Sequence, residues 1–588
     1  MQFHLISVSA CLLTGALAMA ADTASKQDPA REGRVDANGQ RSAVDDGRAQ
    51  GPEMASALFR GEQRETTALS QGATALHRGV WELVIDADAA LEVQPFETAM
   101  RVGFTRPDGT EVTVDGFHER SSQFRARAYC DVAGTWQWHS ESRFSELNGK
   151  SGRFDVGPSQ LPGKLRIHPD DPHQFAYDDG SWFLHIGDTG YRCVTDTEPE
   201  WQAYIDQAVR MGATKIRTWF CRSRGTVGAL FADDRKSLDL TYWREIDRRL
   251  IYALGRYPQI QFQLIPYGED TGELRRYGKG DAASQAIARV SQARWSAFPN
   301  VSWCISNDRE MIAPGTELKH QGVPVAVIDR IGQDMHAREP WGTLLTNHQS
   351  RGKGYSFCKA AWSSVVTLED MDQVDGTLIA TYRSRCSSPV VNDEDRYEHH
   401  RQPMHPRYFF RRLMWASLFS GGHATYGGLR TYEPYDGKLR GVQGYFDACA
   451  TGKLHRGAHD FRHIHAFFKR AGLTLDGWIP DDALTGGNPA KSKCCAKGGS
   501  LLLYLANPTG TQPETDSAAK RSVKCSVRLG PGFYTVRWFD PRNGVFVGNE
   551  VVEGPDAVLT SPGPADWVVL LTRGKVGPGK EQTAPIGE

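Results

Sequence analysis

Residues 301–308 read VSWCISND, an apolar run that ends in an amide and a carboxylate. The same arrangement recurs at residues 389–394, PVVNDE, where an apolar run again ends in polar and acidic residues. Short apolar runs that alternate with helical patterns are typical of the strands of a parallel sheet. Both segments therefore predict parallel β-strands with polar groups at their carboxyl ends.

Eight such runs occur between about residues 175 and 445, and helical patterns separate them, such as the apolar stripe of Trp243, Ile246, Leu250 and Leu254. Eight βα units in roughly 270 residues match the usual size of a (β/α)8 barrel. A doubly wound open sheet is the alternative, but no glycine-rich nucleotide-binding motif follows the first run. The predicted strands are 182–187, 215–220, 260–266, 301–306, 343–346, 364–368, 389–392 and 424–426.

Short alternating runs separated by turns lie on both sides of the predicted barrel. On the amino-terminal side they include residues 80–85 and 124–129, with Pro107-Asp108-Gly109 as a hairpin signal, and on the carboxyl-terminal side residues 500–505 and 567–571. The sequence thus predicts a multidomain protein with a central (β/α)8 TIM barrel at residues 165–475. N-terminal and C-terminal antiparallel β-sandwiches flank it at residues 71–160 and 476–575.

The charge balance excludes several kinds of partner. The 588 residues contain 69 Lys and Arg and 70 Asp and Glu, giving a net charge of -1. Binding to nucleic acid or to an anionic membrane requires concentrated positive charge, so neither is expected. Beyond the first residues no run reaches the roughly 20 apolar residues of a membrane span. The oligomeric state is not indicated by the sequence.

The two ends of the chain differ in composition from the rest. Residues 1–20 form an uncharged apolar segment that ends in Ala18-Met19-Ala20, which predicts a signal peptide and a secreted or periplasmic protein. A buried N-terminal helix is the alternative, because the start of the segment lacks Lys and Arg; a lipoprotein signal at Cys11 fits loosely. Residues 21–70 predict a disordered leader and residues 576–588 a disordered tail.

The cysteines and histidines predict no metal site. The cysteines are scattered without a CxxC pair, and a disulfide between Cys494 or Cys495 and Cys525 is the one expected, with buried free thiols as the alternative. His455, His459 and His463 recur every four residues but lack a further ligand, so we expect a solvated helix face. Neither a metal nor an organic cofactor is expected.

Two acidic sites follow predicted strands on opposite sides of the barrel. Asp308 follows the fourth strand and Glu394 the seventh, so both carboxylates can meet at the barrel mouth. Glycoside hydrolysis needs such a pair, because one carboxyl protonates the leaving oxygen while the other attacks the sugar or activates water. The alternative is that both cap helices or pair with arginines such as Arg309 and Arg396. Glu310 and Asp393 compete for the two roles, although strand alternation would turn Asp393 away from Glu394.

Further polar and aromatic residues at strand ends are candidates for sugar binding, because sugars combine apolar faces with rings of hydroxyl groups. For the aromatic residues and His348 the alternative is a position in the core or at the rim, and for the acidic ones an internal salt bridge. The candidates are Asp188, Trp219, Tyr267, Glu269, His348 and Tyr426.

Several motifs together make the chain resemble the apiosidase-like glycoside hydrolases, over nearly the whole chain after residue 75. The resemblance places Asp308 at the acid/base position and Glu394 at the nucleophile position, and implies that Asn307 hydrogen-bonds a sugar hydroxyl of a polysaccharide or glycan substrate. The motifs lie at residues 105–110, 133–136, 183–191, 299–303, 389–394, 421–428 and 538–544.

Two features leave alternatives open. Retaining members of the clan generally carry Asn-Glu after the fourth strand, and this sequence has Asn307-Asp308. Asp is about 1.5 Å shorter in reach than Glu, which widens the gap between the carboxylates toward the inverting separation. The carboxyl-terminal region resembles a collagen-binding-type domain. An exported carbohydrate- or matrix-binding protein without turnover is therefore the alternative to a hydrolase.

Overall fold

The computed structural model describes residues 68–574 except 95, 121, 192, 196–199, 221–228, 233–234, 269–270, 313–321, 351–353, 370–373, 396–406, 429–457 and 510–520. The expected signal peptide and tail, and nearly all of the expected leader, lie outside these residues. No helix in the described part is both long and apolar enough to cross a membrane.

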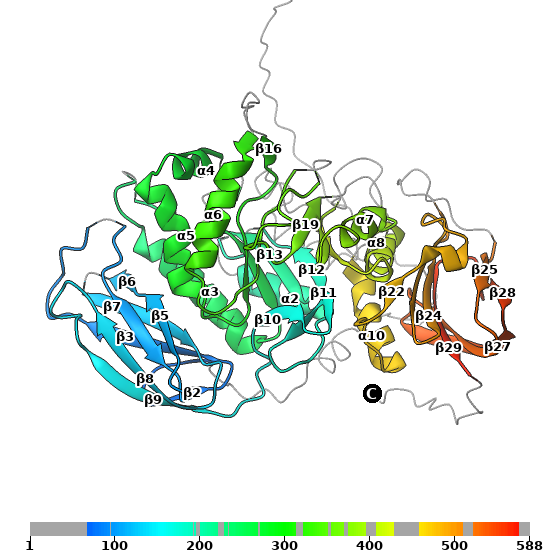
Figure 1. Ribbon diagram of the computed structural model, residues 1–588, viewed down its shortest axis with the longest axis horizontal. Helices are drawn as coiled ribbons and strands as arrows, with labels where there is room; N and C mark the ends of the chain where they lie inside the picture. Colours follow the sequence, from blue (N-terminus) through cyan, green and yellow to red (C-terminus); the bar gives the residue numbers. More distant parts are fainter. Residues whose placement is uncertain are drawn as a thin grey trace, which may run out of the picture. The chain divides into compact units, whose positions relative to one another are not determined.

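The central sheet is an almost closed barrel of eight parallel strands in the order β18-β15-β14-β13-β12-β21-β20-β19. Figure 1 labels β12, β13 and β19 of this sheet. The two outermost strands are joined because the Ser364 N–H donates to the Leu345 carbonyl at 2.9 Å. The Thr346 hydroxyl likewise donates to the Val365 carbonyl at 2.6 Å. The strands are β12 Ile186–Thr189, β13 Lys215–Trp219, β14 Gln261–Ile265, β15 Val301–Cys304, β18 Leu345–Thr346, β19 Val366–Glu369, β20 Val390–Glu394 and β21 His423–Tyr426.

All eight predicted strands are present, and the first begins later than expected. Residues 182–184 extend a hairpin instead of the barrel, because Trp182 bridges Ala176 and the Phe183 N–H donates to the Phe175 carbonyl at 3.0 Å. This hairpin consists of β10 Leu165–His168 and β11 Asp171–Tyr177. The Phe175 ring lies 5.9 Å from that of His185 and 5.0 Å from that of His423. The hairpin therefore covers the amino-terminal end of the barrel.

Helices follow seven of the eight barrel strands. An N-cap bond shows why α3 begins where it does, since the Asp239 side chain accepts from the N–H groups of Thr241 and Tyr242. The helices are α2 Glu200–Arg210, α3 Leu240–Arg256, α4 Thr271–Gly278, α5 Ala282–Trp295, α6 Val325–Ala337, α7 Thr377–Arg383, α8 Arg407–Phe419 and α10 Phe461–Ala471. Two short strands, β16 Glu310–Ile312 and β17 Gly322–Pro324, precede α6.

The amino-terminal region contains two sheets whose side chains share a core. Trp81 of one sheet stacks on Phe154 of the other, with ring centroids 4.0 Å apart. Most strand pairs are antiparallel as expected, but β1 pairs with β3 and β2 with β9 in parallel. The sheets are β1 Leu69–Ser70, β3 Val80–Asp86, β7 Gln123–Tyr129 and β6 Phe117–Arg120, and β2 Thr74–Leu76, β9 Ser151–Gly157, β8 Gly134–Glu141, β4 Arg101–Thr105 and β5 Glu111–Asp115.

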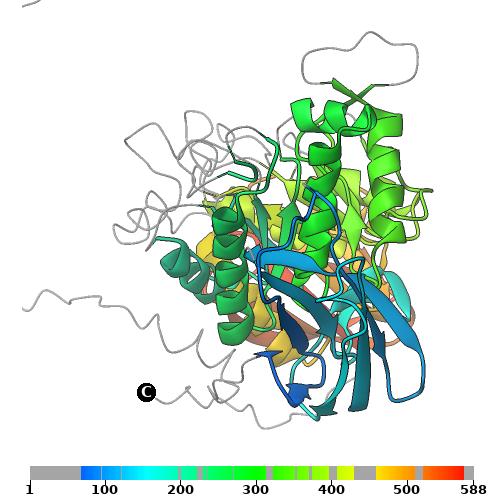
Figure 2. The same ribbon diagram turned by 90° about the vertical axis from the view of Figure 1, so that its left-hand side faces the viewer.

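A buried network of charges joins these sheets to the barrel helices. Figure 2 shows the blue sheets beside the green helices, where β6 and β7 contact α3 and α5. Arg127 of β7 donates to Glu82 at 2.7 Å and to Asp247 of α3 at 3.2 Å. Arg294 of α5 donates to the same Asp247 at 2.5 Å and to Glu119 of β6 at 3.0 Å. Each of these charges is buried and has an opposite partner.

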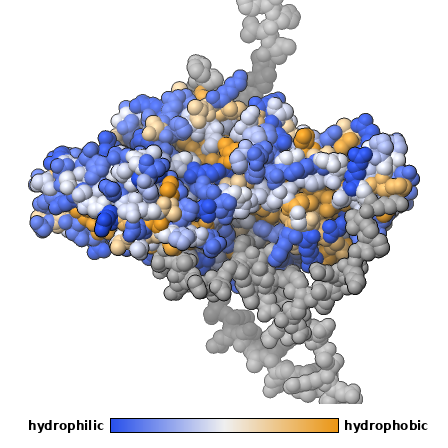
Figure 3. All heavy atoms as spheres, turned by 60° about the horizontal axis from the view of Figure 1, so that its bottom comes forward, coloured by the Kyte–Doolittle hydropathy of each residue, from blue (hydrophilic) through white to orange (hydrophobic). Residues whose placement is uncertain are grey.

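The carboxyl-terminal region is also rich in β-structure. A six-stranded sheet has the order β22-β23-β24-β29-β26-β27, and β25 pairs with β28. Figure 3 shows a mostly hydrophilic surface with small apolar patches, and the exposed large apolar side chains include Ile479, Phe533, Val551 and Val558. The strands are β22 Ile479–Pro480, β23 Ser492–Lys497, β24 Ser500–Leu505, β25 Lys524–Arg528, β26 Phe533–Asp540, β27 Val545–Glu553, β28 Asp556–Thr560 and β29 Trp567–Arg573.

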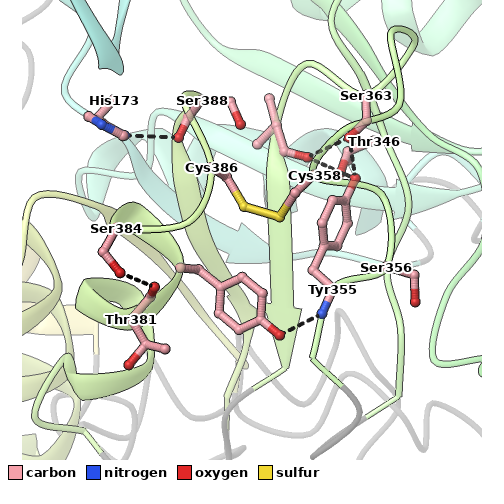
Figure 4. The surroundings of a disulfide bond; sticks show 12 residues. His173, Thr346, Tyr355, Ser356, Cys358, Ser363, Thr381, Ser384, Cys386 and Ser388 are labelled. Carbon is pink, nitrogen blue, oxygen red and sulfur yellow. Dashed lines mark hydrogen bonds between the residues drawn. A yellow bond between two sulfur atoms is a disulfide. The ribbon is translucent and has the colours of Figure 1, made fainter.

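The fifth βα unit differs from the expected pattern, because the described residues between β18 and β19 form no helix. A disulfide between Cys358 of this connection and Cys386, which precedes β20, ties the segment to the turn after α7 (Figure 4). Trp362 of the same connection donates through its indole N–H to Asp329 of α6 at 2.8 Å. A covalent link and a buried tryptophan thus anchor this segment.

The disulfide expected from the sequence was wrong. Cys494, Cys495 and Cys525 are buried free thiols. Strand alternation explains part of this result: Cys494 and Cys525 face the core of the carboxyl-terminal sheets, while Cys495 faces the cluster shared with α8 and α10.

Candidate active site

The interior of the barrel carries a ladder of charges on β13. Lys215, Arg217 and Trp219 alternate along the strand, so their side chains share one face. The Lys215 ammonium donates to Asp393 at 2.6 Å, and Arg217 reaches the next layer toward the carboxyl ends, where it donates to Glu394. Burial opposes the charge of Arg217, but Tyr191 and the two acids outweigh it and raise its pKa well above the usual value.

A bulge in β20 brings two consecutive carboxylates to this ladder. Leu368 pairs with Asn392 and Glu369 pairs with Glu394, so Asp393 is an extra residue in the strand. The expectation that alternation turns Asp393 away from Glu394 was therefore wrong, since Arg217 lies 4.0 Å from Asp393 and 2.9 Å from Glu394. Burial alone would raise the pKa of Asp393, but the charges of Lys215 and Arg217 hold it well below the usual range.

The Glu394 carboxylate is held by donors from separate strands. Its Oε2 atom accepts from the Tyr191 hydroxyl at 2.6 Å and from Arg217 Nη1 at 2.9 Å. His348 Nε2 lies 3.8 Å from the same oxygen. Tyr191 is itself fixed, because its ring stacks on Trp219 with centroids 4.2 Å apart. The orientation of Glu394 thus depends on Arg217 within β13 and on residues that follow β12 and β18.

Asn307 and Asp308 form the bend directly after β15. The Asn307 Oδ1 atom accepts from Arg217 Nη2 and from the Tyr191 hydroxyl. Asp308 is half-buried, has a left-handed backbone with φ 47°, and donates its N–H to His348 Nδ1 at 3.0 Å. Arg309 does not pair with Asp308, because its Nε donates to the Asn307 carbonyl at 2.7 Å. His348 therefore lies between the Asp308 backbone and the Glu394 carboxylate.

Three buried N–H donors outside the charge ladder have no hydrogen-bond partner in the described part of the chain: Asn307 Nδ2, His348 Nε2 and Trp219 Nε1. Arg217 Nε of the ladder also has none and lies 4.0 Å from Asp393. Each belongs to a residue that contacts Glu394 or a residue bound to it. Because buried donors nearly always find an acceptor in the protein, in water or in a ligand, such a group of donors suits a ligand with several acceptor oxygens.

His348 is neutral in this setting. Burial and the nearby charge of Arg217 lower the pKa of His348 to about 3. A backbone N–H can only donate, so the bond from Asp308 requires an unprotonated Nδ1 and places the ring proton on Nε2. The free donor of His348 therefore faces Glu394.

The other predicted binding residues lie in different surroundings. Asp188 points outward to α2, where it accepts from the Tyr204 hydroxyl at 2.7 Å, and burial raises its pKa to about 6. Tyr267 donates to the Ser284 carbonyl of α5, and the Tyr426 ring packs between Phe410 and Phe461. No described contact brings these three residues to Glu394, and Glu269 lies outside the described residues.

Tyr191 and Arg217 were missed as site residues. Arg217 carried a usable signal, because two cations at alternate positions in a strand that reads as fully buried need partners inside the barrel. Tyr191 carried no comparable signal, because its position depends on the turn after β12. Glu310, a competitor for the acid role, lies in β16 and pairs with β17.

The described residues contain no group of three or more His, Cys, Asp or Glu side chains that could hold a metal ion. The rings of His459 and His463 lie 5.9 Å apart, and His463 Nδ1 lies 3.0 Å from the Pro541 carbonyl. His455 lies outside the described residues.

Comparisons with known proteins match this architecture. Residues 170–473 match a family model described as "Apiosidase-like, catalytic domain", and residues 79–143 match a domain of unknown function (DUF5060). A solved structure described as a "putative glycoside hydrolase from Bacteroides vulgatus ATCC 8482" has a TM-score of 0.68 and 16% identity over 85% of this chain and 100% of that chain. A "glycoside hydrolase family 5" structure from the same organism has a TM-score of 0.55 and 15% identity over 71% of this chain and 94% of that chain. These structures support the fold, and no curated protein matches the chain.

Proposed function

We propose that this chain, a glycoside hydrolase that belongs to the apiosidase-like family, cleaves an O-glycosidic bond of a polysaccharide or glycan with Asp308 and Glu394 as its carboxylate pair. The family match covers more than half of the chain and confirms the resemblance inferred from the sequence motifs. The pair, the substrate and the location of the protein are the parts that we propose.

The observation that carries the proposal is the group of three buried, unpartnered donors beside Glu394. A sugar ring supplies the acceptor oxygens that Asn307, His348 and Trp219 lack, and its apolar face suits an aromatic neighbour. The surroundings of Asp308 fit the role of general acid, because its carboxylate has no hydrogen bond or ion pair with the described residues. It is thus left to meet the substrate.

In this mechanism Asp308 donates a proton to the leaving glycosidic oxygen while Glu394 acts on the anomeric carbon. Tyr191 and Arg217 fix the orientation of Glu394, so little rearrangement is needed when a sugar binds. Glu394 attacks the carbon directly if the enzyme retains configuration, and activates a water molecule if it inverts. The short side chain of Asp308 favours the wider, inverting separation.

We also propose that the protein is exported, with residues 1–20 as its signal peptide. The disulfide between Cys358 and Cys386 supports this proposal, because disulfides persist mainly in oxidising compartments. Fractionation of cells that express the full chain, with the mature N-terminus determined by mass spectrometry, tests it. Cytoplasmic protein with an intact N-terminus would contradict it.

The function is tested with Asp308→Asn and Glu394→Gln variants on a panel of plant, algal and bacterial polysaccharides. We expect each variant to lose at least about 10³-fold in kcat while it still binds the substrate that the wild type hydrolyses. The anomer first formed, followed by NMR, distinguishes retention from inversion. Wild-type protein that binds a glycan or collagen without turnover would support the alternative of a binding protein and refute the hydrolase mechanism.

A further inference from the structure

His348 contacts both halves of the proposed carboxylate pair through its two ring nitrogens. Its Nδ1 accepts from the Asp308 N–H at 3.0 Å, and its Nε2 lies 3.8 Å from Glu394 Oε2. The side chain is 0% exposed, so the ring is held in place by its surroundings. A change in its position would therefore act on both carboxylates.

The backbone of Asp308 needs such a support. Its φ of 47° lies in the left-handed region, which is unfavourable for a residue with a Cβ atom although Asp tolerates it better than most. The neighbouring residues are fixed on both sides: the Asn307 N–H donates to the Gly268 carbonyl at 3.0 Å, and Arg309 forms a bridge with Gln349. The Asp308 N–H lies between these two anchors and is bound by His348 alone among the contacts described.

We propose that His348 is a positioning residue for the acid: Nδ1 holds Asp308 in its left-handed conformation, which aims the carboxyl group at the leaving oxygen beside Glu394. This inference rests on the proposed function, because it needs Asp308 as the proton donor. It assigns to Nδ1 of His348 a role in addition to the sugar contact proposed for Nε2. The connection after β18 would then contribute to proton transfer without touching the leaving group.

Two variants of His348 separate the roles of its ring nitrogens Nδ1 and Nε2. In His348→Asn the amide oxygen lies close to the position of Nδ1 and can still accept from the Asp308 N–H. In His348→Gln the amide nitrogen lies close to the position of Nε2, and the acceptor for Asp308 is lost. We expect the Asn variant to raise KM, because it lacks the Nε2 donor to the sugar, and to keep a higher kcat than the Gln variant. The kcat of the Gln variant should fall about 10- to 100-fold, the cost of one misplaced hydrogen-bonded group.

The dependence on the leaving group supplies a readout that a purely structural role would not change. Aryl glycosides of the sugar that the wild type hydrolyses are compared, with 4-nitrophenol and the more acidic 2,4-dinitrophenol as leaving groups. A good leaving group needs little proton donation. The loss in His348→Gln should therefore be much smaller with 2,4-dinitrophenol. His423→Asn is the matched control, because His423 is equally buried at the other end of the barrel.

The proposal is overturned if His348→Gln retains the kcat of the wild type while His348→Asn loses it. It is also overturned if the loss of kcat in His348→Gln is the same for both leaving groups. A crystal structure of His348→Gln provides a test without turnover: an unchanged left-handed φ at Asp308 would also overturn it. If the Gln variant does not fold, His348→Ala replaces it, and an Asn variant no more active than the Ala variant contradicts the proposal. Failure of the proposed function is distinct, since wild type and Asp308→Asn would then both lack turnover.

Discussion

Arg217→Lys is the substitution that best tests how the site is held together. The Arg217 guanidinium donates through Nη1 to Glu394 and to the Asp393 carbonyl, each at 2.9 Å, and through Nη2 to Asn307. Lysine keeps the positive charge, but its single ammonium group cannot span these acceptors as the planar fork does. The variant therefore keeps the net charge and removes the arrangement of donors that reaches all three acceptors.

The size of the effect follows from the bonds that are lost. A hydrogen bond to a charged group contributes about 1.5–3 kcal/mol, and the ammonium group of the variant can replace only part of the set. With about 2–3 kcal/mol lost from the orientation of Glu394 and Asn307, kcat/KM should fall about 30- to 150-fold. Most of this loss should appear in kcat, because the orientation matters most in the transition state.

The assay combines steady-state kinetics with urea unfolding monitored by circular dichroism. Arg294→Lys is the matched control: Arg294 is also fully buried and bound to two acids, but it lies in the network between α5 and the amino-terminal sheets. Both variants should lose stability, and only Arg217→Lys should lose activity per folded molecule. A kcat/KM for Arg217→Lys within about 3-fold of the wild type would refute the argument that Arg217 orients the site.

Three further substitutions test separate features. Burial raises the pKa of Asp188 to about 6, so the native state loses about 3 kcal/mol of stability as pH rises from about 4 to 6. Asp188→Asn should remove this loss, which urea unfolding at pH 4 and pH 8 measures. The prediction is contradicted if wild type and variant differ in stability by the same amount at both pH values. Replacing Cys358 and Cys386 together by Ser should lower the free energy of unfolding by about 3–4 kcal/mol. Reductant should lower the Tm of the wild type but not of the variant, and an equal response of both would exclude a stabilising disulfide. Trp219→Phe keeps an aromatic ring beside Tyr191 and removes the indole N–H. KM should therefore rise about 3- to 10-fold with kcat nearly unchanged. An unchanged KM would show that this donor binds no substrate.

The barrel could be predicted because most of its strands are short, rich in apolar residues and followed by a helical pattern. The departures come from tertiary contacts that no local pattern encodes. Residues 182–184 resemble a barrel strand but pair with the hairpin below it. The helix expected after β18 is absent among the described residues, where Gly354 has φ 73° and Tyr355 and Trp362 pack in its place.

The site was predictable where a residue lies at or just beyond the carboxyl end of a strand and its side chain points inward. This holds for Asn307, His348 and Trp219, which the structure brings into contact with residues around Glu394. Tyr267 and Tyr426 lie at the same end of their strands but face helices, because alternation sends every second side chain outward. The bulge at Asp393 could not be predicted, since an extra residue in a strand leaves no mark in its composition.

The buried ion pairs between the amino-terminal sheets and the helices limit how this protein can be divided. A barrel expressed from residue 165 onward would leave Arg294 and Asp247 facing water or apolar surface without Arg127 and Glu119. Cutting the chain there breaks these ion pairs and exposes the apolar surface packed around them, which costs stability. The amino-terminal sheets and the barrel should therefore be expressed together, and we expect them to stay together when domains recombine in evolution.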